Sequence, residues 1–151
     1  MKNYRSDAIR NIGLFAHSGA GKTSLAEAAL FNAGVIDRIG KVDEGNTLCD
    51  FDPEEIKRCI SISTSLAPVE WKNVKINFLD TPGYFDFVGE VKSAARVVES
   101  ALIVTCAVSG VEVGTEQVGK ICEGMPSIFF INKMDRENAN FNKVLGQIRE
   151  F

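Results

Sequence analysis

The chain has 151 residues, of which 17 are basic and 20 acidic, so its net charge is −3. This length allows one globular domain, and the mild acidity argues against binding DNA through bulk positive charge. The four cysteines show no C-x-x-C spacing, which argues against a structural zinc site or a disulfide framework and favours reduced thiols in a cytoplasm. The longest uncharged stretch, residues 100–111, is too short to span a bilayer, so we predict a cytoplasmic protein without a membrane partner.

The first half of the chain predicts a strand, a helix and a long loop, in that order. Residues 9–16 are largely apolar and predict the strand. A glycine-bearing turn leads into a strong helix-forming run from Lys22, which Gly34 can end. Residues 35–63 show no sustained hydrophobic period, so we predict a long, mobile loop with room for one short helical piece.

The second half predicts a hairpin followed by alternating helices and strands. Residues 69–71 and 74–78 alternate between apolar and polar positions around a possible turn at 72–73. Apolar residues recur at helical spacing in three segments, 88–98, 118–122 and 141–148, and the continuous apolar runs 101–108 and 128–131 predict buried parallel strands. The fold class is therefore α/β, a three-layer sandwich of about five strands and four helices, with a mostly parallel sheet and one antiparallel edge strand.

The sharpest motif lies between the first strand and the first helix. Residues 16–23 read AHSGAGKT and match the phosphate loop G-x-x-x-x-G-K-[ST], except that Ala16 replaces the first glycine. Such a loop points backbone N–H groups and the positive end of the helix at a bound anion, and it predicts a P-loop NTPase fold. Lys22 would reach the β- and γ-phosphates and the Thr23 hydroxyl would bind Mg²⁺. The other loop residues expected around the phosphates are Ser18, Gly19, Ala20, Gly21 and Ser24. The alternative is a glycine turn before a helix with an exposed lysine.

A second motif, DTPG at residues 80–83, follows the second strand of the hairpin. If the sheet is assembled in the usual way, this segment lies beside the first strand. Asp80 can then hold Mg²⁺ through a water molecule, and the N–H of Gly83 can point at a γ-phosphate. Read alone, D-x-x-G is usually a turn, but its position after a phosphate loop favours the nucleotide role.

A third motif, NKMD at residues 132–135, follows the strand predicted at 128–131. Asp135 would accept hydrogen bonds from the N1–H and the exocyclic amine of guanine, a donor pair that adenine lacks. Asn132 can bond the other side of the base, and the stem of Lys133 can pack over it. Without the first two motifs, this segment would be read as a polar loop after a strand.

With these three motifs in order, the chain resembles the guanine-nucleotide-binding domain of the translational GTPase family, and its elongation factor G-like branch most closely. The segments RNIG at 10–13, VSGVE at 108–112 and NKMDR at 132–136 strengthen the resemblance, and EGNT at 44–47 and DPEE at 52–55 fit that branch. The resemblance implies a GTPase that binds GTP or GDP with Mg²⁺ and docks on ribosomal RNA and proteins. It also implies two switch segments that sense the γ-phosphate, residues 35–63 and 80 to about 90.

In the first switch, the family pattern ends Arg-Gly-Ile-Thr, where this chain reads Arg58-Cys59-Ile60-Ser61. The family threonine binds Mg²⁺ and the γ-phosphate. Ser61 keeps the hydroxyl, so the resemblance implies the same role for it. Ile60 would form one side of the hydrophobic gate near the attacking water.

Two departures from the family bear on catalysis. The family carries a histidine after DTPG that positions the attacking water, whereas this chain has Tyr84, and its single histidine, His17, belongs to the phosphate loop. A phenol is neutral at physiological pH, so we expect hydrolysis to be slower or differently triggered. Gly19 stands where the family usually has an aspartate that helps to bind a monovalent cation or contacts ribosomal RNA, and glycine supplies no carboxylate.

The family's last base-contacting loop, final strand and closing helix should come later than the 16 residues that follow Asp135. We therefore expect residues 1–151 to form a GTP-binding domain that is incomplete at its C-terminal end, as a piece of a longer factor. The missing strand would pair with residues 128–131, so an isolated piece should expose an apolar edge and be marginally stable or self-associate.

Two functions share all of these nucleotide contacts. The first is a ribosome-associated GTPase in which Lys22, Gly83 and Tyr84 act in catalysis, with weak hydrolysis in the isolated piece. The second is a slowly hydrolysing, GTP-dependent binding switch on the ribosome or another partner. They differ in what Tyr84 does.

The remaining features predict ordinary structure. We expect the phenylalanines Phe129, Phe130, Phe141 and Phe151 in the core, unless truncation exposes Phe151, and we expect Trp71 to pack on its strand. The charged residues Glu54, Glu55, Lys57 and Arg58 should form a solvated loop face. The cysteines should be small buried apolar residues or bystanders without a role.

Overall fold

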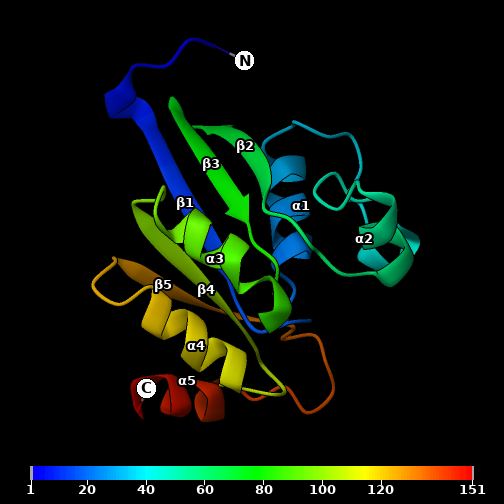
Figure 1. Cartoon of the computed structure of the whole chain (residues 1–151), viewed down its shortest axis with the longest axis vertical. Coiled ribbons are helices and arrows are strands. Elements are labelled where there is room, and N and C mark those ends of the chain that lie inside the picture. Colours follow the sequence, from blue (N-terminus) through cyan, green and yellow to red (C-terminus); the bar gives the residue numbers. More distant parts are fainter. Residues whose placement is uncertain (1, 151) are drawn as a thin grey trace.

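The computed structural model describes residues 2–150 as one five-stranded sheet with helices on both faces (Figure 1). The strands lie in the order β2-β3-β1-β4-β5, and only the β2–β3 pair is antiparallel. The strands are β1 (Ile9–Phe15), β2 (Ser65–Trp71), β3 (Val74–Asp80), β4 (Ser100–Cys106) and β5 (Ser127–Asn132). The α-helices are α1 (Lys22–Asn32), α2 (Pro53–Arg58), α3 (Val88–Ala95), α4 (Val113–Ile121) and α5 (Phe141–Glu150). The predicted α/β class, with a mostly parallel sheet and one antiparallel edge strand, is confirmed.

The β2–β3 hairpin closes with the two-residue turn that the sequence predicts. Lys72 and Asn73 both adopt positive φ angles, 46° and 65°. Two consecutive left-handed residues match the right-handed twist of the flanking strands, and asparagine tolerates this conformation better than most residues. The hairpin therefore places β3 beside β1 in parallel, with Leu14 opposite Asp80.

Adjacent residues of β1 point to opposite faces of the sheet, and each face has its own apolar cluster. Leu14 packs with Ala26 and Leu30 of α1 on one face. Phe15 packs with Val91 of α3 and Val118 of α4 on the other. The sheet is thus the middle layer between α1 and the α3–α4 pair, which Figure 1 shows in front of the strands.

The parallel arrangement brings the three sequence motifs to one edge of the sheet. β1 ends directly before the phosphate loop, β3 ends at Asp80, and β5 ends at Asn132. Parallel neighbours end on the same side, so loops far apart in sequence meet there. The hydroxyl of Thr81 donates a 2.7 Å hydrogen bond to the carbonyl of Leu14, which ties the second motif to β1.

The predicted long loop at 35–63 contains more regular structure than expected, while its mobility stays a prediction. It contains a 3₁₀ turn, η2 (Val42–Glu44), and the helix α2, which Figure 1 shows beyond α1. Asp52 caps α2: its side chain accepts from the N–H of Glu54, while the Glu55 side chain accepts from the N–H of Asp52, forming a capping box. Pro53 occupies the first turn, where a missing N–H costs nothing.

Several predictions of burial were wrong. Phe130 is 39% exposed and Phe141 is 47% exposed, because Phe130 lies on the edge strand β5 and Phe141 begins α5. Trp71 is half-exposed at the end of β2. Phe129 does pack against the α3–α4 cluster, whereas Phe151 lies outside the described residues. Three cysteines are buried as predicted, and Cys59 is exposed.

Two smaller features complete the fold. The 3₁₀ turns η1 (Ser6–Ala8) and η3 (Phe85–Phe87) precede β1 and α3, respectively. Within residues 2–150, no helix combines the length and the apolar character needed to cross a membrane.

Candidate functional site

The phosphate loop forms the floor of a cavity of about 530 Å³, a volume within the usual range of small-molecule sites. Gly19 and Gly21 have φ angles of 73° and 99°, values that favour glycine, and α1 begins directly after them at Lys22. Of the predicted loop residues, those that line the cavity are Ser18, Gly19, Gly21, Lys22, Thr23 and Ser24. Ala20 instead faces the core, where it is 2% exposed beside Ala16 and Val104.

Lys22 is the buried cation of the site, with 6% of its surface exposed. Burial lowers the pKa of its ammonium group, and the carboxylates of Asp80 and Asp50 act in the opposite direction. A buried ammonium without a close counter-ion is costly, so this position favours an incoming anion. The floor of the cavity is therefore suited to a phosphate chain.

Gly83 brings the second motif against the phosphate loop. A Cβ at this position would lie 2.6 Å from Nζ of Lys22 and 2.7 Å from Cα of Ser18. Only glycine fits there without displacing backbone. Gly83 and the following Tyr84 both line the cavity, and Tyr84 is 43% exposed.

Hard oxygen atoms gather on the side of the cavity next to α1. The hydroxyls of Thr23 and Ser61 are 3.3 Å apart, and Ser61 donates a 2.7 Å hydrogen bond to Oδ1 of Asp50. Asp80 is 1% exposed, and neither of its carboxylate oxygens makes a hydrogen bond of good geometry within residues 2–150, although the Lys22 charge and the Thr23 hydroxyl both favour its ionised form. Burial raises its pKa to about 7, against the opposing charge of Lys22.

This donor set fits Mg²⁺, because Mg²⁺ prefers oxygen ligands. A bound cation would also stabilise the charge of a buried carboxylate such as that of Asp80. Oδ2 of Asp50 is also buried without a partner in the described part of the chain, and burial raises the pKa of that carboxyl group. No cluster of three His, Cys, Asp or Glu side chains in residues 2–150 is placed to hold a metal by itself. A divalent ion here would therefore need phosphate oxygens as further ligands.

Glu55 holds the two residues that follow Ser61, and its predicted place on a solvated face was wrong. Glu55 is 2% exposed, and its Oε1 accepts from the N–H groups of Ile62 at 2.8 Å and Ser63 at 3.1 Å. Cys59 ends α2 in the left-handed conformation, with φ of 53°, which turns the chain back toward the cavity. The local reason is the capping box, which orients the Glu55 carboxylate inward.

The third motif is tied to the phosphate loop by two side chains. Nδ2 of Asn132 donates to the carbonyl of Ala20 at 3.0 Å, and Nζ of Lys133 donates to the carbonyl of Gly19 at 2.6 Å. Lys133 lines the cavity, whereas Asp135 is exposed and does not line it. The structure thus gathers most of the predicted phosphate residues around the cavity, together with Thr23 and Ser61. Asp80, Asn132 and Asp135 are not among the lining residues.

Sequence reasoning missed part of the cavity wall. The missed lining residues are Ile39, Gly40, Lys41, Val42, Asp43, Asp50, Cys59 and Arg136, while Ile60, which the resemblance placed near the attacking water, also lines the cavity. They come from irregular segments, where no periodicity marks an inward-facing side chain. For Asp50, the sequence offers one local signal: this acidic residue directly follows the apolar pair Leu48-Cys49.

Comparison of sequences gives matches along nearly the whole chain. The chain is 44% identical over 144 residues to ribosome-releasing factor 2, mitochondrial, of Debaryomyces hansenii, covering 94% of the chain and 17% of that protein. It is 42% identical over 143 residues to elongation factor G 2 of Borreliella burgdorferi, covering 93% of the chain and 21% of that protein. The chain therefore spans about a fifth of the length of these curated relatives.

Solved structures share the fold. A protein from Thermus thermophilus superposes with a TM-score of 0.91 at 36% identity, covering 95% of this chain and 22% of that one. Translation elongation factor SelB of Methanococcus maripaludis, solved with the GTP analogue GppNHp, gives a TM-score of 0.69 at 22% identity, covering 99% of this chain and 26% of that one. The second likeness shows the fold alone.

The resemblance to elongation factor G-like proteins inferred from the motifs is confirmed by these relatives. Residues 7–151 also match the family described as the elongation factor Tu GTP-binding domain. This match covers the three motifs and both segments that wall the cavity. The chain belongs to the elongation factor Tu GTP-binding domain family.

Proposed function

We propose that this chain binds GTP with Mg²⁺ and hydrolyses it to GDP and phosphate as part of a ribosome-associated translation factor. The observation that carries the proposal is Lys22, a buried cation that lines the cavity and whose charge interacts with the buried carboxylate of Asp80, a residue outside the lining. The buried ammonium group of Lys22 suits an anion such as a phosphate, and the buried oxygen atoms beside it suit a metal cation. The site therefore suits a complex of a metal ion with a polyphosphate.

Phosphate binding falls to the loop before α1. The positive end of α1 and the backbone N–H groups of this loop would hold the phosphates, as in other glycine-rich anion-binding loops. The N–H groups are those of Ser18, Gly19, Ala20, Gly21, Lys22, Thr23 and Ser24. Lys22 would pair with the β- and γ-phosphates. Its burial keeps water from competing for the ammonium group.

Thr23 and Ser61 would bind Mg²⁺ through their hydroxyls, and Asp80 would hold it through a water molecule. Asp50, which accepts from Ser61 at 2.7 Å, would orient that hydroxyl. When bound, Mg²⁺ neutralises negative charge on the phosphate oxygens during phosphoryl transfer.

Guanine recognition falls to the third motif. Asn132 and Lys133 are already held against the phosphate loop at 3.0 Å and 2.6 Å. Asp135 would accept from the N1–H and amine of the base at the rim of the cavity.

The hydrolytic step depends on the second motif. The N–H of Gly83 would point at the γ-phosphate, and the phenol of Tyr84 would orient the attacking water. Tyr84 lines the same cavity as Lys22, which supports this role. A neutral phenol supplies less stabilisation than a cationic group, so chemistry should depend strongly on the ribosome.

A slower, switch-like function is the second candidate. Hydrogen bonds such as those accepted by Glu55 hold residues 35–63 against the cavity. In this function, the conformation of that segment with GTP bound is what a partner recognises. The names of the relatives, a mitochondrial ribosome-releasing factor and a bacterial elongation factor, support the ribosome as that partner. A cytoplasmic location, an incomplete domain over residues 1–151 and self-association through the exposed edge strand β5 stay predictions.

Single-turnover hydrolysis of GTP, measured with and without ribosomes, tests the proposal. For a full-length factor containing this chain, we expect strong ribosomal stimulation that Tyr84→Phe reduces at least 10-fold. Unchanged stimulation in Tyr84→Phe would remove Tyr84 from catalysis. Ribosome binding that requires GTP but brings no stimulation would favour the switch, and the absence of guanine-nucleotide binding would overturn both functions.

A further inference from the structure

Glu27 is a buried carboxylate of α1 that belongs to none of the three motifs. It is 1% exposed, its Oε2 accepts from the N–H of Gly40 at 3.0 Å, and its Oε1 accepts from the N–H of Leu48 at 2.5 Å. One side chain thus holds both ends of residues 40–48, called here the front loop. Hydrogen bonds to a buried charged acceptor are strong, so this anchor fixes the front loop on α1.

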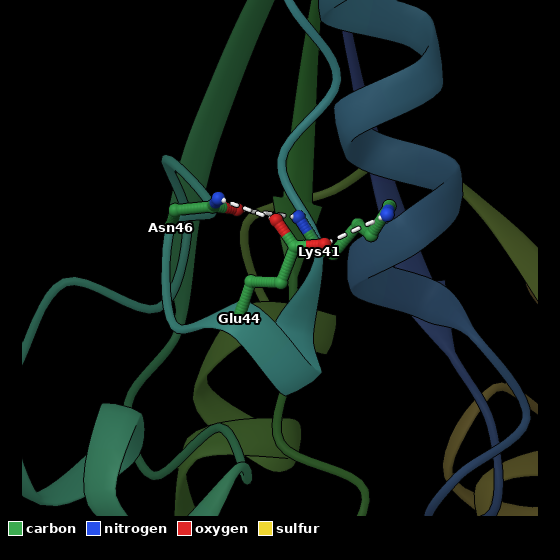
Figure 2. Close-up of polar contacts among 3 residues, drawn as sticks. All are labelled: Lys41, Glu44 and Asn46. Atoms are coloured by element: carbon green, nitrogen blue, oxygen red, sulfur yellow. Dashed lines mark hydrogen bonds and ion pairs between the residues drawn. The ribbon is translucent and has the colours of Figure 1, made fainter.

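The front loop is braced internally as well as anchored. Nζ of Lys41 lies 2.7 Å from Oε1 of Glu44, the N–H of Lys41 donates to Oδ1 of Asn46 at 2.7 Å, and Nδ2 of Asn46 donates to Oε2 of Glu44 at 3.1 Å (Figure 2). At Gly40, a Cβ would lie 2.7 Å from Cα of Thr47. The front loop is therefore a compact unit, and Glu27 fixes its position on α1.

Directly after Leu48 the chain reaches the proposed metal site. Cys49 is buried in the α1 cluster, and its carbonyl accepts from the hydroxyl of Ser65 at 2.6 Å. The next residue, Asp50, accepts from Ser61 at 2.7 Å, and Ser61 lies 3.3 Å from Thr23. Only one residue, Cys49, separates the Glu27 anchor at Leu48 from Asp50, whose carboxylate orients the Ser61 hydroxyl.

We propose that Glu27 is a positioning residue, which fixes Asp50 and through it the Ser61 hydroxyl, and so sets the Mg²⁺-dependent preference for GTP over GDP. This inference rests on the proposed function, since Ser61 is the group assigned to Mg²⁺ beside the γ-phosphate. Glu27 is not among the residues that line the cavity. GDP would be held by the phosphate loop and the third motif, which keep their contacts without Glu27.

Two substitutions separate this role from a general structural one. Glu27→Gln keeps the shape and one acceptor oxygen, and Glu27→Met keeps the approximate volume and removes both acceptors. Glu54→Gln is the matched control, because Glu54 lies on the exposed face of α2, where it pairs with Arg58 at 3.0 Å. It makes the same charge change as Glu27→Gln, but at an exposed position.

The affinities for guanosine 5′-(β,γ-imido)triphosphate and for GDP are measured with MgCl₂ and again with EDTA. In MgCl₂, we expect the affinity for the triphosphate analogue to fall about 5-fold in Glu27→Gln and about 10-fold in Glu27→Met, the scale of one or two lost hydrogen bonds. GDP affinity should change less than about 2-fold, and Glu54→Gln should match the wild type. Equal losses for both nucleotides, or no loss for either, would overturn the inference.

Amide hydrogen exchange on the unsubstituted chain gives a readout that survives if the variants fail to fold. Without nucleotide, the amides of Gly40 and Leu48 should be protected. Because coupling is reciprocal, the analogue with Mg²⁺ should slow exchange at Leu48 further, and GDP should not. Fast exchange at Leu48 in the nucleotide-free chain, or the same protection with both nucleotides, would reject the role.

These outcomes are distinct from a failure of the proposed function. A wild-type chain that binds neither nucleotide would overturn the guanine-nucleotide site itself. A wild-type chain that binds both, with an Mg²⁺-dependent preference that the Glu27 variants leave intact, would overturn only the assignment of Glu27.

Discussion

The backbone N–H of Thr64 donates a 3.0 Å hydrogen bond to Oε2 of Glu90. Thr64 follows the predicted first switch and precedes β2, whereas Glu90 lies in the first turn of α3, at the end of the predicted second switch. The contact links two segments that are 26 residues apart. A displacement of α3 must therefore carry Thr64 with it or break this bond.

Replacing Glu90 tests that link. Glu90→Ala removes the acceptor of the Thr64 N–H, so we expect the free energy of unfolding to fall by about 1–2 kcal/mol. We also expect amide exchange at Thr64 to quicken. Glu116→Ala, on the exposed side of α4, is the control and should change the unfolding free energy by less than about 0.5 kcal/mol. Similar exchange at Thr64 in both variants would show that the link does not hold the switch.

Asp80 gives the nucleotide-free chain a distinct pH dependence. Burial raises its pKa from the ordinary value of 3.8 to about 7. Between these values the folded state holds a proton that the unfolded state has released, so the stability from this group is complete below about pH 4 and is lost as the pH rises through about 7. The full loss corresponds to about 4 kcal/mol.

Denaturant unfolding in EDTA, from pH 5 to pH 8, measures this effect. The unfolding free energy of the wild type should fall over this range relative to that of Asp80→Asn, which carries no titrating group at this position. Adding Mg²⁺ and a GTP analogue should remove the difference in slope, because a bound cation favours the ionised carboxylate. Parallel curves for the two proteins in EDTA would contradict a raised pKa.

The sequence predicted the sheet and the three motifs because their signals are local. The turn at Lys72 and Asn73 and the phosphate loop each depend on a few adjacent residues, and the parallel topology then brings the loops together. The roles of Glu27 and Glu55 could not be predicted in this way. Each accepts from backbone N–H groups in an irregular segment, and nothing in a run of charged residues indicates which carboxylate turns inward.

Burial at the sheet edge shows a limit of the apolar pattern taken alone, because the exposed edge at residues 128–131 was predicted only from the family resemblance. Residues 128–131 are apolar, and an apolar run predicts a strand covered on both faces. In the structure, β5 has β4 as its only neighbour in the described sheet, and Ile128 is 69% exposed. An apolar run thus reports strand formation more reliably than it reports what covers the strand.

Gly83 should tolerate no side chain. In Gly83→Ala, the new methyl group would meet Nζ of Lys22, which can move, and Cα of Ser18, which cannot move without distorting the phosphate loop. We expect nucleotide affinity to fall at least 10-fold and the unfolding free energy to fall by about 1–3 kcal/mol.

Gly89→Ala is a matched control for this substitution. Gly89 lies in α3, and a Cβ there would meet nothing within 4 Å among the described residues. Because alanine is the better helix former, this variant should keep its affinity and gain up to about 1 kcal/mol of stability. Isothermal titration with guanosine 5′-(β,γ-imido)triphosphate and thermal unfolding measure both quantities. A Gly83→Ala chain that binds this triphosphate analogue normally would show that the second motif does not approach the γ-phosphate as closely as proposed.

Asp135 should decide which base the site accepts. Its carboxylate offers two acceptors, which match the N1–H and the exocyclic amine of guanine. Asp135→Asn replaces one acceptor with an amide donor, which suits the carbonyl that xanthine carries in place of the amine. We therefore expect GDP affinity to fall at least 10-fold and affinity for xanthosine diphosphate to rise above it, in competition binding against a labelled nucleotide. Met134→Ala, at the exposed neighbouring position, should leave the preference for guanine unchanged. Unaltered guanine preference in Asp135→Asn would assign base reading to other residues at the rim, of which Arg136 already lines the cavity.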